Sequence, residues 1–124
     1  MLIPDSLKKS LRENISLKEY SAFKTGGQAS FLFEPDSIIL LQKGLKFFSE
    51  QDIPTFMLAG GTNILIHDQG FNGAVISLKG EFFSRCEITD NKILCGSNLS
   101  NHVLSNKAQK AGISGFEFLN SIPG

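Results

Sequence analysis

The sequence has little of what would place the protein outside the cytosol. Two cysteines, Cys86 and Cys95, are too few for a disulfide framework or a zinc site. No apolar run approaches the roughly 18 to 20 residues that a membrane span requires. The first six residues lack the charged start and apolar block of a secretory signal. We therefore expect a cytoplasmic protein with no membrane partner.

An excess of charge of one sign is also missing, because 12 basic residues balance 12 acidic ones. A neutral chain lacks the electrostatic attraction that draws basic proteins to nucleic acid, so we expect no nucleic-acid partner. Tryptophan is absent and there is one tyrosine, whereas phenylalanine occurs 11 times. We expect most of these rings to fill the core of a single domain, which 124 residues are enough to form.

The central feature that is present is a glycine-containing segment, Ala59-Gly-Gly-Thr-Asn63, directly after an apolar run. The run, residues 55–59, predicts a buried strand. Backbone N–H groups next to short polar side chains suit an anion, typically a phosphate. The spacing does not fit a P-loop, since Lys79 follows too late to act as its lysine. A plain tight turn is the alternative interpretation.

The strongest helix prediction covers residues 37–51. Its apolar residues fall on one stripe, and Ser37 suits the N-cap; the stripe is Ile38, Leu41, Leu45 and Phe48. Strands predicted at 31–34 and 55–59 flank this helix, so we expect a βαβ unit with these strands as parallel neighbours. Ligands of such sheets lie at the carboxyl ends of the strands, where the glycine segment lies.

Other segments predict a helix over 5–14, a strand over 74–78, a hairpin over 84–95 that turns at Asp90-Asn91, and a helix over 100–111. The second helix has Ser100 as its cap, Gly112 after its end and a stripe of Val103, Leu104, Ala108 and Ala111. The hairpin register places Cys86 opposite Cys95. A disulfide there is sterically conceivable, but two buried, reduced thiols are favoured in a reducing cytosol. We expect His102 to be a surface or packing residue.

Four blocks of sequence, in the same order and spacing, resemble the N-terminal part of the UDP-N-acetylenolpyruvoylglucosamine reductase (UDP-N-acetylmuramate dehydrogenase) family. They are Ser21-Ala-Phe-Lys-Thr-Gly-Gly27, Ala59-Gly-Gly-Thr-Asn-Ile-Leu65, Asp68-Gln-Gly-Phe-Asn-Gly73 and Gly112-Ile-Ser-Gly-Phe-Glu-Phe-Leu-Asn-Ser-Ile-Pro-Gly124. The chain departs from the family at Ala59, often glycine, and at Thr62, often serine. Neither change removes the close backbone approach or the hydroxyl.

The resemblance implies an α+β fold and an FAD-binding domain of the vanillyl-alcohol-oxidase (PCMH) type. It places a small βαβ lobe at about 1–72 and the start of a larger lobe with antiparallel strands at about 73–124, without the substrate-binding domain. The implied FAD-binding residues are Ala59, Gly60, Gly61, Thr62, Asn63, Ile64 and Leu65 around the pyrophosphate, with Ile122, Pro123 and Gly124 approaching the flavin.

The family passes hydride from NADPH to FAD and on to the enolpyruvyl group of UDP-GlcNAc enolpyruvate, in peptidoglycan synthesis. Its proton-donating serine, arginine and glutamate come from sequence that this chain does not match, so no catalytic or metal residue is assigned. We expect the FAD-binding N-terminal portion of such an oxidoreductase, inactive alone, with the missing part possible on a second polypeptide. A stand-alone flavin- or nucleotide-binding module and a non-functional remnant stay open as alternatives.

Overall fold

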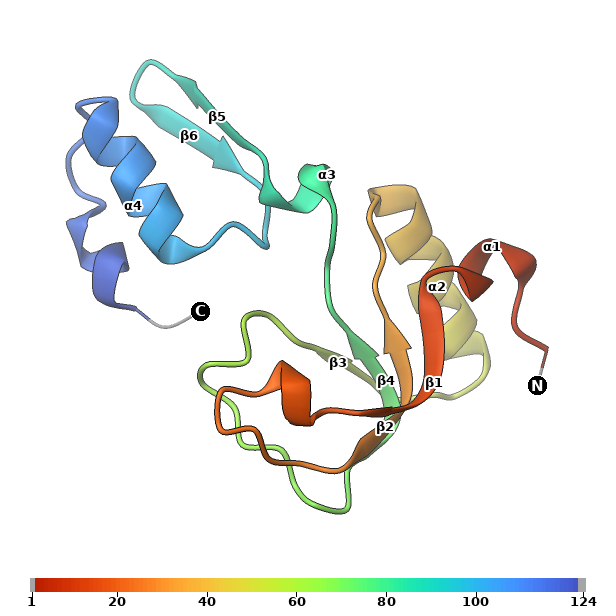
Figure 1. The fold of residues 1–124 in the computed structure, drawn as a ribbon. Helices are drawn as coiled ribbons and strands as arrows, with labels where there is room; N and C mark the ends of the chain where they lie inside the picture. The colour runs from red at the N-terminus through yellow and green to blue at the C-terminus, as the bar shows by residue number, and fades with distance from the viewer. Residues whose placement is uncertain (1, 123–124) are drawn as a thin grey trace.

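A four-stranded sheet organises the first two thirds of the chain in the computed structural model, which describes residues 2–122 (Figure 1). The strand order is β1-β2-β4-β3, where β1 is antiparallel to β2 and the other three strands are parallel. Their bounds are β1 Leu11–Ser16, β2 Gln28–Phe33, β3 Thr55–Met57 and β4 Phe71–Ile76. A mixed sheet with helices gives the α+β class that the sequence predicted.

One face of this sheet is covered by α2, Ile38–Glu50, and by the short α1, Asp5–Lys8. The Ser37 side chain caps α2 as predicted, because its Oγ accepts a hydrogen bond from the Leu40 N–H. Phe48 is fully buried and meets the Phe33 ring edge-on at 5.6 Å between centroids. Aromatic pairs in this geometry stabilise a core beyond their buried area.

The buried face of α2 differs from the predicted stripe. Gly44, Phe47 and Phe48 are buried, whereas Ile38 and Leu45 are about two-fifths exposed. Gly44 explains the difference, because a Cβ there would lie 2.2 Å from Cε1 of Phe33. The helix thus uses its glycine, which lowers helix propensity, to let the Phe33 ring approach its axis.

The opposite face of the sheet carries a second apolar cluster, formed by Leu17, Ala29, Leu32, Leu58 and Val75. Leu17 precedes a short 3-10 helix, η1, at Lys18–Tyr20. Leu58 directly follows β3. This cluster therefore anchors the chain at Leu17 and at Leu58, where it leaves the sheet after β1 and after β3.

The prediction that strands 31–34 and 55–59 are neighbours was wrong, because β4 lies between β2 and β3. All but the first two residues of β4 are buried, which suits a central strand. The prediction of a buried strand over 55–59 was also wrong, because all three residues of β3 are exposed at the sheet edge. The strand predicted over 74–78 thus belongs to the first sheet, which extends past the expected lobe boundary near residue 72. The division into an FAD-binding small lobe and the start of a larger one stays a prediction.

The predicted helix over 5–14 was also wrong beyond its first turn. It ends at Lys8, and Leu11 begins β1 opposite Phe33 of β2. Leu7 and Leu11 are both buried in the apolar cluster between α2 and the sheet. Their spacing suited a helix, but Leu11 is in a strand because it pairs with Phe33, 22 residues away. Local periodicity does not indicate such distant pairing.

The last third of the chain forms a hairpin and a helix that lie apart from the first sheet (Figure 1). Its elements are α3 Glu81–Ser84, β5 Cys86–Thr89, β6 Lys92–Cys95, α4 Asn101–Lys110 and the 3-10 helix η2 Glu117–Ser121. The hairpin turns at Asp90, which has a φ of 52°, and its register is the predicted one. The Ser100 cap of α4 is confirmed, but the helix buries Ser105 and Ala108 and leaves Val103 exposed. Within residues 2–122, no helix is long and apolar enough to cross a membrane.

Candidate functional site

The glycine loop lies where the parallel strands end. The Leu58 N–H donates to the Ile76 carbonyl at 2.8 Å, and after this bond the chain leaves the sheet. Residues 56–64 then line a hollow of about 160 Å³. The loop therefore stands at the carboxyl edge of a parallel sheet, the edge at which such sheets bind ligands.

Five consecutive N–H groups in this loop have no acceptor within the part of the protein that the structure describes. Across the described residues, none of the amides from Ala59 to Asn63 donates a hydrogen bond. Four of these residues are exposed, so water or a ligand can reach them, and Gly61 alone is buried. Successive backbone N–H groups in a turn can converge on an anionic oxygen, and this loop contains a bend at Gly61 followed by a turn at residues 62–63.

Gly61 fixes the shape of the loop through its contacts with residues 20–22, at the end of η1. Its φ is +68°, and a Cβ there would lie 2.0 Å from the Tyr20 carbonyl oxygen. The Ala22 N–H donates to the Gly61 carbonyl at 3.0 Å. The loop is thus held against residues 20–22, and only glycine combines this conformation with this approach.

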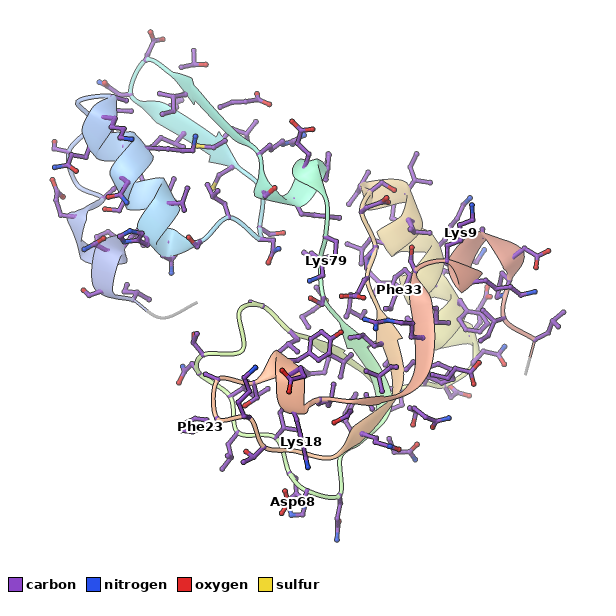
Figure 2. All side chains as sticks on the ribbon, in the orientation of Figure 1. Lys9, Lys18, Phe23, Phe33, Asp68 and Lys79 are labelled. Atoms are coloured by element: carbon purple, nitrogen blue, oxygen red, sulfur yellow. The ribbon has the colours of Figure 1, made fainter. Side chains whose placement is uncertain are left out.

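The glycine pair Gly26-Gly27 makes a similar close contact with residues 67–70, which follow the loop. The Gly27 N–H donates to the His67 carbonyl at 3.0 Å, and the Gly70 N–H shares that acceptor at 2.9 Å. A Cβ on Gly27 would lie 2.2 Å from the Asp68 carbonyl oxygen. Figure 2 shows Phe23 and Asp68 on the two loops that these contacts join. Three of the four sequence blocks therefore form one structural unit.

The fourth block lies on the other part of the chain. Residues 112–122 follow α4, and the Ile122 N–H donates to the Leu119 carbonyl at 3.3 Å. Among the described residues, no hydrogen bond joins Ile122 to residues 59–65, and its side chain is 45% exposed. Pro123 and Gly124, the two other residues assigned to the flavin, lie outside the described residues.

An apolar hollow of about 170 Å³ adjoins the loop. It shares Phe56, Leu58 and Ile64 with the first hollow and reaches Leu65. The Leu65 side chain is 77% exposed. The predicted site thus combines free amide donors with apolar side chains, a mixture that suits a ligand with both phosphate and flat apolar groups.

A charged group that sequence reasoning missed also lies at the carboxyl edge. Arg12 Nη2 donates to the Tyr20 hydroxyl at 2.7 Å and to Glu34, whose other oxygen is 3.5 Å from Lys79 Nζ. The hydrogen bond to Glu34, and then that to Tyr20, raise the pKa of Arg12 above its ordinary value. Figure 2 shows Lys79 on the segment that leaves β4. No spacing in the sequence indicated this group, because strand pairing brings its members together.

Among the described residues, His67 is the one acid–base side chain that lines either hollow beside the loop. The His67 Nδ1 accepts from the Gln69 N–H at 3.1 Å, and the exposed His102 contacts Asn106 and Asn120. Glu117 accepts from the Gly115 N–H. Within the described part of the chain, no cluster of three metal-ligating side chains occurs. Within residues 2–122, none of these side chains is hydrogen-bonded to residues 59–65, and His102 is a surface residue, as predicted.

Comparison with known proteins gives consistent relatives, although no family model matches the chain. The UDP-N-acetylenolpyruvoylglucosamine reductase of Rickettsia massiliae is 39% identical over 127 residues, covering the whole chain and 41% of the relative. The enzyme of that name from Clostridium novyi is 32% identical over 117 residues, covering 94% of the chain and 38% of the relative.

A solved structure agrees with these relatives. The crystal structure of UDP-N-acetylenolpyruvylglucosamine reductase from Thermus caldophilus matches with a TM-score of 0.70 and 32% identity, covering 91% of this chain and 39% of that one. The chain therefore spans about two fifths of the length of the relatives it matches. Over its whole length it is similar to the N-terminal part of the UDP-N-acetylenolpyruvoylglucosamine reductases, as the four sequence blocks predicted.

Proposed function

We propose that this chain is the FAD-binding N-terminal portion of a UDP-N-acetylenolpyruvoylglucosamine reductase. The observation that carries the proposal is a row of five amides, Ala59 to Asn63, at the carboxyl edge of the sheet, none of which has an acceptor within residues 2–122. The FAD pyrophosphate would lie on these amides, with Ile64 and Leu65 beside it. The relatives' names indicate the reaction class, and the loop supplies a site that fits the cofactor's most charged group.

The residues of the loop fit a pyrophosphate for a steric reason as well. The buried Gly61 has a φ of +68° and a close contact with the Tyr20 carbonyl oxygen, so this position adds no side chain to the row of N–H groups. Thr62 and Asn63 are exposed and carry a hydroxyl and an amide within the row of N–H groups. The adjoining apolar hollow lined by Phe56 and Ile64 suits the apolar parts of the ligand. The FAD-binding domain would be of the PCMH type.

When bound, FAD would supply hydride transfer between NADPH and the enolpyruvyl group of UDP-GlcNAc enolpyruvate, in peptidoglycan synthesis. The role of this chain is to hold and orient the pyrophosphate. The catalytic groups and the UDP-sugar site would lie in the part of the relatives that it does not match, on the same or a second polypeptide. The setting would be the cytoplasm, without nucleic-acid or membrane partners.

The proposal is tested by titrating the purified chain with FAD while following flavin fluorescence. We expect binding that ADP weakens, since ADP carries the same pyrophosphate. Gly60→Val should reduce the affinity at least about tenfold, because its branched side chain would cover the free amides. Ala111→Val adds bulk at an exposed position after α4 and should bind FAD like the parent chain. Equal affinity of the parent chain and a folded Gly60→Val variant would show that the loop assignment is wrong.

A further inference from the structure

The two cysteines of the chain face each other across the β5–β6 hairpin. Cys86 pairs directly with Cys95, at the end of the ladder farthest from the turn. Both are free thiols, and both are partly exposed to solvent, so the prediction that they are buried was wrong. A dissolved oxidant can therefore reach them without unfolding of the hairpin.

The hydrogen bond next to this pair defines its geometry. The Gly96 N–H donates to the Arg85 carbonyl at 2.9 Å, so Arg85 and Gly96 form a hydrogen-bonded pair. In an antiparallel ladder the two kinds of pair alternate, which makes Cys86 and Cys95 a non-hydrogen-bonded pair. Such pairs have Cα atoms about 4.5 Å apart, within the range of about 4.4 to 6.8 Å that a disulfide spans.

The base of the hairpin is held in place from outside the ladder. The Asn98 N–H donates to the Phe83 carbonyl at 2.8 Å, and Asn98 Nδ2 donates to the Leu78 carbonyl at 3.0 Å. A Cβ on Gly96 would lie 2.2 Å from the Phe83 carbonyl oxygen, which shows how closely the two backbones pass. The residues beside both cysteines are thus held by hydrogen bonds while the strands keep the two cysteines opposite each other.

We propose that Cys86 and Cys95 are a modification site that forms a reversible intramolecular disulfide with a low-molecular-weight disulfide oxidant. One thiolate attacks oxidised glutathione, forms a mixed disulfide and releases one molecule of glutathione. The other thiolate then attacks the cysteine sulfur of that mixed disulfide and releases the second molecule. Two protein protons and two electrons leave the thiols, and the oxidant is reduced to two glutathione molecules, so the step balances.

The test uses the whole chain in buffers that contain graded ratios of oxidised to reduced glutathione. After free thiols are alkylated, trypsin cuts behind Arg85, Lys92 and Lys107, which separates the two cysteines into peptides 86–92 and 93–107. We expect mass spectrometry without reductant to show these two peptides joined, from a protein that stays monomeric. Dithiothreitol should separate them completely.

A register control distinguishes cross-strand geometry from simple proximity. Combining Cys95→Ser with Leu94→Cys moves one thiol by a single position, to the opposite side of the ribbon from Cys86. We expect at least about tenfold less joined peptide from this variant and mixed glutathione adducts instead. Adducts or intermolecular dimers as the main products of the parent chain would overturn the proposal, as would equal cross-linking of the register variant.

Discussion

The carbonyl oxygen of Tyr20 occupies the place where a side chain at Gly61 would begin, 2.0 Å from the ideal Cβ position. The same contact includes a hydrogen bond from the Ala22 N–H to the Gly61 carbonyl at 3.0 Å. Residues 20–22, at and after the end of η1, therefore hold the glycine loop in place at Gly61. The free amides of that loop can face solvent because its other side is held by this backbone.

We expect Gly61→Ala to destabilise the chain more than Gly112→Ala does. Both glycines have positive φ, +68° and +72°, so both changes bring backbone strain. At Gly61 the added Cβ would also collide with the Tyr20 carbonyl oxygen, whereas nothing lies within 4 Å of a Cβ on Gly112. The free energy of unfolding in urea should fall by about 1 to 3 kcal/mol more for Gly61→Ala. Equal losses would mean that the Tyr20 contact does not constrain the loop.

Gly44→Ala should also destabilise the chain, although alanine favours a helix by about 1 kcal/mol over glycine. The new Cβ would lie 2.2 Å from Cε1 of Phe33, and the fully buried ring has little room to move. We expect a net loss of about 1 to 3 kcal/mol in urea unfolding. In a Phe33→Leu background the same change should be neutral or stabilising. A stabilising Gly44→Ala in the parent chain would contradict the packing described for α2.

Arg12→Met should lower stability by about 1 kcal/mol or less, since the Arg12 side chain is 49% exposed and solvent screens its ion pair with Glu34. The raised pKa of Arg12 means that the folded state favours its protonated form. That contribution is fully present below the unfolded pKa of the arginine side chain and is lost only as pH rises through the higher folded value. The deficit should therefore stay constant from about pH 6 to about pH 9.

A matched control for Arg12→Met is Lys24→Met, which removes a more exposed pair with Glu19. We expect Lys24→Met to change the unfolding free energy by less than about 0.5 kcal/mol. Urea unfolding at several pH values and salt concentrations separates the two variants. A deficit for Arg12→Met that disappears between about pH 6 and about pH 9 would show that another titrating group carries it.

Purified residues 1–124 should show no NADPH-dependent reduction of UDP-GlcNAc enolpyruvate, even with added FAD. The chain matches only 41% of the Rickettsia massiliae relative's length, and acid–base side chains do not converge on residues 59–65 within the described region. The measurement is NADPH absorbance in the presence of the substrate. The matching control is a full-length reductase under the same conditions. Turnover by the 124-residue chain would refute the proposed division of roles.

The sequence by itself determined the features that depend on neighbouring residues. Ser37 and Ser100 were identified as helix caps, because a cap needs only a hydroxyl three residues before an N–H. The hairpin register around Asp90 followed from its turn, which sets the pairing of the strands on both sides. The resemblance of the glycine loop to known reductases also came from contiguous blocks.

Only the tertiary structure decided which distant segments meet. Leu11 lies in a strand because it pairs with Phe33. The strand β4 lies between β2 and β3, where four of its residues are buried. The contact of Gly61 with Tyr20 likewise joins positions 41 residues apart. Periodicity and propensity describe one segment at a time, whereas these outcomes depend on the burial and backbone hydrogen bonds that two segments gain together.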